Sequence, residues 1–195
     1  MMPWKTTVFG WITLFALLLI AHGCGGSSAK PAGGAATSKL YLQNNIHAQA
    51  GPRDIKASYA NWTDPGAGHL IIPVNTPVEF KKYRKGLIIK NLIDGRQVFF
   101  EFHPRNMGMS AEEYIPLITS PSTVSLKGLS GIDRKGIQEG KAYVGMTKEG
   151  VRVALGYPAA HRTPSLESGT WIYWKNRFKT IAVEFSADGQ VQFIR

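Results

Sequence analysis

The side chains best suited to acid–base or metal chemistry are histidines, and they are dispersed along the chain. Four of the five lie beyond the apolar N-terminal run, at His47, His69, His103 and His161. No two of these four lie four residues apart, so no helix face presents a pair of imidazoles to a metal ion. The chain has one cysteine and contains no H-E-x-x-H, C-x-x-C, G-x-S-x-G or P-loop motif. We therefore predict no catalytic residue, no metal and no cofactor.

One polar cluster, around His161, combines residue types that enzymes use. Arg162, Thr163, Ser165 and Glu167 follow it in a loop expected between a helix and a strand. Loops held between structured elements commonly contact partners. We interpret His161 and Arg162 as candidate interface residues, and an enzyme acting through this loop is the alternative hypothesis.

Four aromatic residues near the C-terminus are candidates for the same interface, because Trp and Tyr dominate interface hot spots. They are Trp171, Tyr173, Trp174 and Phe178. Strand alternation places Trp171 and Tyr173 on one face and Trp174 on the other. Packing in the core is the competing interpretation for most of these rings.

The N-terminus has the pattern of an export signal. Lys5 precedes an apolar run from Val8 to Ala21, which is shorter than the roughly 20 residues of a membrane-spanning helix. The run ends in Ala21-His22-Gly23-Cys24. This sequence resembles the lipobox of bacterial lipoproteins, with Ala21 where Leu is usual, and the resemblance implies lipidation of Cys24. An ordinary secretory signal and an uncleaved anchor helix are the alternatives.

The lipobox resemblance implies both a division of the chain and a location. Residues 1–23 would be the signal peptide, and residues 24–38, rich in Gly, Ala and Ser, the lipidated cysteine and a flexible tether. Gly25 stands where Asp signals retention in the inner membrane, which implies the periplasmic face of the outer membrane.

The formal charge is +10, with 23 basic and 13 acidic residues. We expect contact with anionic lipids or acidic partners and none with nucleic acid.

The most basic tract of the chain is Lys81-Lys82-Tyr83-Arg84-Lys85. We treat Lys81, Lys82, Arg84 and Lys85 as a candidate patch for an anionic ligand, such as a headgroup, peptidoglycan or another anionic glycan. The competing interpretation is a solvated hairpin tip whose lysines discourage pairing between sheet edges.

Residues 39–128 are predicted to form a small β-rich domain similar to an SH3-like barrel. Asp94-Gly95 separates two strand-like runs and predicts a two-residue type I′ hairpin. Ser110 and Glu113 predict the capping box of a short helix, which Pro116 limits to about two turns.

Residues 129–195 are predicted to form a second module, a helix followed by a three-stranded antiparallel meander. Thr147 is the expected N-cap of the helix, and Gly156 its left-handed C-terminal residue. Strand-like runs then cover 170–174, 178–185 and 190–194. The predicted fold class is therefore α+β.

The second module carries motifs in an order that resembles the SmpA/OmlA (BamE-like) lipoprotein domain. They are Gly145-Met-Thr-Lys-Glu-Gly-Val151, Leu155-Gly-Tyr-Pro158, Thr170–Trp174 and Val183–Val191. The resemblance covers about residues 141–195. It implies an outer-membrane lipoprotein of the kind that assists the β-barrel assembly machinery. This chain departs from that family in the additional segment 39–128 and in a longer loop after the helix.

Together these patterns predict a non-enzymatic, lipid-anchored cell-envelope protein. Its expected role is a protein-interaction scaffold in outer-membrane assembly or envelope integrity, with envelope proteins as partners. A periplasmic lipoprotein that binds peptidoglycan or an anionic glycan is the alternative.

Overall fold

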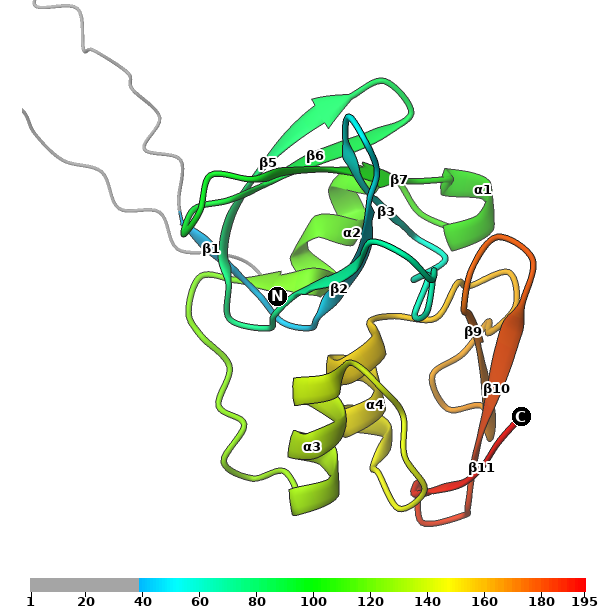
Figure 1. Cartoon of the computed structure of the whole chain (residues 1–195). Coiled ribbons are helices and arrows are strands. Elements are labelled where there is room, and N and C mark those ends of the chain that lie inside the picture. Colours follow the sequence, from blue (N-terminus) through cyan, green and yellow to red (C-terminus); the bar gives the residue numbers. More distant parts are fainter. Residues whose placement is uncertain (1–38) are drawn as a thin grey trace, which may run out of the picture. The chain divides into compact units, whose positions relative to one another are not determined.

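The computed structural model describes residues 39–195. The predicted signal peptide, Cys24 and the whole of the predicted tether lie outside the described residues. Within the described part, eleven strands and four short helices follow one another along the chain (Figure 1).

The larger sheet has eight strands and curls around helix α2 (Ala111–Ile118) (Figure 1). Its strand order is β4-β2-β3-β7-β6-β5-β1-β8. Neighbouring strands are antiparallel, except that β3 and β7 are parallel. The strands are β1 (Leu40–Leu42), β2 (Ile46–Ala50), β3 (Ile55–Ser58), β4 (His69–Ile72), β5 (Pro77–Tyr83), β6 (Gly86–Asn91), β7 (Gln97–Glu101) and β8 (Thr119–Ser120).

The smaller sheet is an antiparallel one with the order β11-β10-β9. Its strands are β9 (Thr170–Trp174), β10 (Thr180–Phe185) and β11 (Val191–Ile194). Helices α3 (Gly131–Glu139) and α4 (Lys148–Leu155) pack against each other and share a hydrophobic cluster with this sheet. A single turn of helix, α1 (Pro104–Met107), follows β7.

The predicted α+β fold class is wrong, because the described residues form a mostly β fold. The four helices have only 4 to 9 residues each, and the curled, mixed eight-stranded sheet dominates. Strand β8 pairs with β1 through Tyr41 and Ser120, and β3 joins β7 through Lys56 and Phe99. These pairings link residues far apart in the chain, so local hydrophobic patterns do not record them.

Local signals within the elements have mixed outcomes. The capping box at Ser110 and the N-cap at Thr147 are confirmed. The type I′ turn is wrong, since β6 ends at Asn91, β7 begins at Gln97 and only Gly95 of the Asp-Gly pair has a positive φ. Gly156 ends α4 with φ 83° and ψ −171°, outside the left-handed helical region that we expected.

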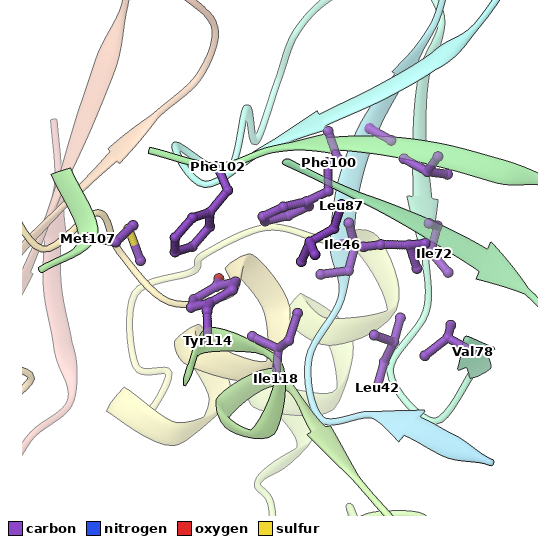
Figure 2. Close-up of a cluster of buried hydrophobic side chains, with 14 of the residues drawn as sticks. Leu42, Ile46, Ile72, Val78, Leu87, Phe100, Phe102, Met107, Tyr114 and Ile118 are labelled. Atoms are coloured by element: carbon purple, nitrogen blue, oxygen red, sulfur yellow. The ribbon is translucent and has the colours of Figure 1, made fainter. Parts of the chain in front are cut away.

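Two hydrophobic clusters stabilise the fold. In the first, the curled sheet covers α2, and the ring centroid of Tyr114 lies 5.9 Å from that of Phe100 and 5.2 Å from that of Phe102 (Figure 2). In the second, between the helix pair and the smaller sheet, the rings of Trp171 and Phe185 lie 4.8 Å apart.

Polar groups that precede β2 or follow β3 hold the C-terminal ends of α3 and α4. The Asn45 backbone N–H donates to the Val153 carbonyl at 2.8 Å, and its side-chain amide donates to the Ile137 carbonyl at 2.7 Å. The Asn61 amide donates to the Leu155 carbonyl at 2.9 Å. These bonds satisfy carbonyls that a helix end leaves unpaired, and they join the two hydrophobic clusters.

Candidate functional site

The basic tract forms the end of β5 and the turn that leads to β6, with Arg84 and Lys85 as the two turn residues. Successive side chains of a strand point to opposite faces of the sheet, so those of Lys81 and Lys82 diverge. The structure therefore divides the candidate patch. Lys81 and Arg84 line one groove, whereas Lys82, Arg84 and Lys85 line another.

The first groove, here named the outer groove, follows a row of side chains across four strands. Lys56 of β3 lies opposite Phe99 of β7, Phe99 opposite Ile88 of β6, and Ile88 opposite Lys81 of β5. The row thus has an apolar centre and a cation at each end. The outer groove has a volume of about 640 Å³, within the ~300–1,000 Å³ range of small-ligand sites.

The outer groove carries an excess of positive charge. Arg53 and Arg84 join Lys56 and Lys81 in lining it, and Asp54 is the one carboxylate among the lining residues. The Lys56 Nζ lies 3.2 Å from the Asp54 Oδ2, so three cations remain in excess. All these groups are exposed, and salt will screen their attraction for an anion.

Aromatic rings complete the outer groove. The Tyr83 ring lies edge-on to Phe99, with centroids 6.0 Å apart, and the Arg84 guanidinium lies 5.1 Å from the Tyr83 centroid. Cation–π attraction favours this placement of Arg84. Apolar ring faces beside cations are suited to a ligand that combines an apolar surface with acidic groups.

Lys82 lies outside the outer groove and is already paired. Its Nζ is 2.9 Å from the Glu112 Oε1 in the first turn of α2. This hydrogen bond raises the pKa of Lys82 and lowers the pKa of Glu112. Lys82 instead belongs to a second groove of about 430 Å³, which Arg84, Lys85 and His103 also line. Arg84 is common to both grooves.

The aromatic interface candidates differ sharply in exposure. Trp171 and Tyr173 are 2% and 0% exposed and lie in the second hydrophobic cluster. The Trp171 Nε1 donates to the Leu166 carbonyl at 3.2 Å, and the Tyr173 hydroxyl donates to the Gly156 carbonyl at 3.0 Å. Burial raises the pKa of Tyr173. Both rings are therefore already packed and bonded, so neither is available to anchor a partner.

The other interface candidates are more accessible. Phe178 is 90% exposed in the loop between β9 and β10, whereas Trp174 is half-buried. His161 and Arg162 are exposed, and the His161 ring centroid lies 6.3 Å from that of Tyr59. Phe178 is the aromatic candidate that a partner could contact.

Sequence reasoning missed two cations of the outer groove and a pair of histidines, of which His47 is buried and His69 half-buried. Arg53 and Lys56 reach the groove only because β3 pairs in parallel with β7, which no local pattern signals. His47 and His69 face each other, with the His47 Nδ1 3.1 Å from the His69 Nε2. They lie on neighbouring strands, and their spacing in sequence does not identify them as a pair.

Residues 39–195 contain no group of three or more His, Cys, Asp or Glu side chains arranged to hold a metal ion. In the same range, no helix has the length and apolar character needed to cross a membrane. Comparison of the chain with models of protein families, with curated proteins and with solved structures found no match. The SmpA/OmlA resemblance therefore rests on the sequence motifs alone and stays a prediction.

Proposed function

We propose that this chain is a non-enzymatic, lipid-anchored protein of the bacterial cell envelope that binds an anionic glycan in the outer groove. The main support is the row of side chains across four strands, which places an apolar floor between cations: Lys56, Phe99, Ile88 and Lys81. Lipidation of Cys24 would hold the groove near the outer membrane, on a tether whose reach is roughly 20 Å.

The chemistry of the outer groove favours a glycan over a lipid headgroup. Peptidoglycan and other acidic glycans combine carboxylates with sugar rings, whose apolar faces can pack on aromatic side chains. Arg53 and Lys81 would attract the carboxylates, while Phe99 and Tyr83 would contact the rings. A headgroup requires the cations but makes no use of the aromatic floor.

Retention of the protein on purified peptidoglycan sacculi tests the proposal. At low salt, the triple variant Lys56→Gln, Lys81→Gln, Arg84→Gln should be retained about tenfold less than the wild type, at roughly 0.5 kcal/mol for each exposed charge. High salt should reduce the retention of the wild type toward that of the triple variant, because it screens the exposed charges. Phe99→Ser should weaken the retention that persists at high salt.

A matched variant controls for net charge. Lys127→Gln, Lys135→Gln, Lys179→Gln removes the same three charges from exposed positions that line neither groove. It should be retained like the wild type. Equal losses in the two triple variants would attribute retention to overall charge and contradict a role for the outer groove.

A second candidate function, the protein-interaction scaffold, is favoured by Phe178. This ring is 90% exposed and follows Arg177, whose guanidinium lies 5.3 Å from the centroid of the Trp62 ring. Exposed aromatic and arginine side chains are typical of interface hot spots. The SmpA/OmlA resemblance implies the β-barrel assembly machinery as the partner.

Photo-crosslinking in intact cells tests the scaffold. A photoreactive phenylalanine analogue at position 178 should form a discrete adduct that mass spectrometry identifies as an envelope protein. The same analogue at Ile93, which is 73% exposed, serves as the control. Identical adducts from both positions, or none from position 178, would exclude Phe178 as a docking residue.

A further inference from the structure

The turn that joins β5 to β6 holds Arg84 in an unusual backbone conformation. Arg84 has a φ of 49°, in the left-handed region, and the turn consists of Arg84 and Lys85 alone. Two-residue hairpin turns with a positive φ favour Gly, Asn or Asp, because a larger side chain is strained there. A solvated hairpin tip would gain from one of those residues. The presence of arginine at this position points to a role for its side chain in binding.

Arg84 stands where the two grooves meet. On one side, the outer groove contains Arg53, Lys56 and Lys81; on the other, the second groove contains Lys85. The two grooves have volumes of about 640 and 430 Å³, and Arg84 lines both of them. A compact ligand would fill one groove, whereas an extended chain could occupy both by crossing the turn.

The second groove has the same chemical character as the outer groove. Pro104 and Ala111 contribute apolar surface, and Lys85 and His103 contribute nitrogen groups. Lys82 is already paired with Glu112, so Lys85 and Arg84 are the cations of this groove without an ion pair among the described residues. The repeat of apolar surface beside cations suits a ligand that itself repeats sugar rings and acidic groups.

We propose that the ligand is an extended anionic glycan strand that crosses Arg84 and occupies both grooves at once. This inference rests on the proposed function and adds to it the length of the ligand and the residue at its crossing point. Arg84 binds acidic groups of the strand from the turn, and this contact offsets the strain of its backbone conformation.

Calorimetry measures the affinity of the intact lipoprotein, in detergent, for uronic-acid disaccharides, tetrasaccharides and octasaccharides. Affinity should rise more steeply from tetrasaccharide to octasaccharide than expected from the larger number of equivalent positions at which a longer chain can bind a single groove. Lys85→Gln should weaken octasaccharide binding roughly two- to fivefold, the effect of one exposed ion pair, and should weaken disaccharide binding less. Lys56→Gln should weaken binding of all three lengths. Lys127→Gln, outside both grooves, is the charge control.

Arg84→Asn gives a readout that a merely structural role would not produce. Asn tolerates a positive φ, so this variant should unfold about 1–4 °C higher than the wild type. Its octasaccharide affinity should nevertheless fall by more than that of Lys85→Gln, because both grooves lose a cation. A variant that is more stable and binds the octasaccharide as well as the wild type would overturn the role of Arg84.

The outcomes separate this inference from the proposed function. If octasaccharides bind no more tightly than tetrasaccharides and Lys85→Gln has no effect, the extended strand is excluded while binding in the outer groove stands. If no oligosaccharide or sacculus binds, both fail. Binding to vesicles of anionic phospholipid in the absence of any glycan binding would assign the cations to the membrane surface and overturn both.

Discussion

At the scale of single residues, His47 connects the larger sheet to α4. Its Nε2 donates to the Ala154 carbonyl at 2.9 Å, so its Nδ1 must accept from the His69 Nε2, 3.1 Å away. Burial lowers the pKa of His47 to about 4. Burial also lowers the pKa of His69, which Asp64 raises and Lys141 lowers further. Neutral imidazoles are therefore part of the packing between sheet and helix.

The protein should lose stability on acidification. The pKa of His47 is 6.5 in the unfolded chain and about 4 in the folded protein. Its contribution to folding stability is therefore complete above pH 6.5 and is lost as the pH falls to 4. This shift corresponds to about 3 kcal/mol. Denaturant unfolding followed by circular dichroism across this range measures the loss.

Two variants isolate the contribution of His47 to that pH dependence. His47→Gln should be less stable at neutral pH but should show a flatter stability profile between pH 6.5 and 4. His161→Gln changes an exposed imidazole and should follow the wild type. A profile as steep in His47→Gln as in the wild type would attribute the acid sensitivity to other groups.

At the scale of elements, α3 and α4 meet through a glycine and a buried carboxylate. Asp133 of α3 is 0% exposed; its Oδ2 accepts from the Ser130 hydroxyl at 2.8 Å and its Oδ1 from the Thr147 backbone N–H at 2.8 Å. One carboxylate thus supports the N-terminal caps of both helices. A Cβ on Gly150 would lie 2.0 Å from the Asp133 Oδ1 and 2.5 Å from its Cγ. The close approach of the helices requires glycine there.

Gly150→Ala should therefore destabilise the fold, although alanine is the better helix former. We expect a loss of about 3 kcal/mol, because overpacking displaces the Asp133 carboxylate from its donors. Gly131→Ala is the matched control within α3, since a Cβ there meets no atom within 4 Å. That variant should gain up to about 1 kcal/mol. Thermal unfolding of both variants measures the difference, and equal effects would contradict close packing at Gly150.

At the scale of the whole molecule, the proposed lipidation of Cys24 is expected to control location without affecting folding. Cys24→Ala should release the protein from the membrane fraction, because each buried CH₂ of an acyl chain contributes about 0.8 kcal/mol. Its unfolding curve should match the wild type. Cell fractionation with immunoblotting measures the release, and Ser27→Ala in the tether is the control. Persistence of Cys24→Ala with membranes would show that another segment anchors the chain.

Predictions of helix caps succeeded, because neighbouring residues in the chain are sufficient to form them. Ser110 and Thr147 cap their helices because an N-cap bonds to a backbone group only a few residues away. Fold class failed because the pairings of β3 with β7 and of β8 with β1 bring distant segments into one curled eight-stranded sheet, which no local pattern signals. The candidate site was predicted in part: Lys81 and Arg84 line the outer groove, but Lys82 diverges from it by strand alternation.

The helix caps, the apolar periodicity of the strands and the clustering of positive charge at residues 81–85 can all be read from the chain alone, since they depend on near neighbours. Which cations act together depends on the folded arrangement of the strands. It carried Arg53 and Lys56 beside Phe99, buried Trp171 and Tyr173, and paired His47 with His69. The physical reason is that register between distant strands depends on burying one face of the whole sheet, a condition that no single segment specifies.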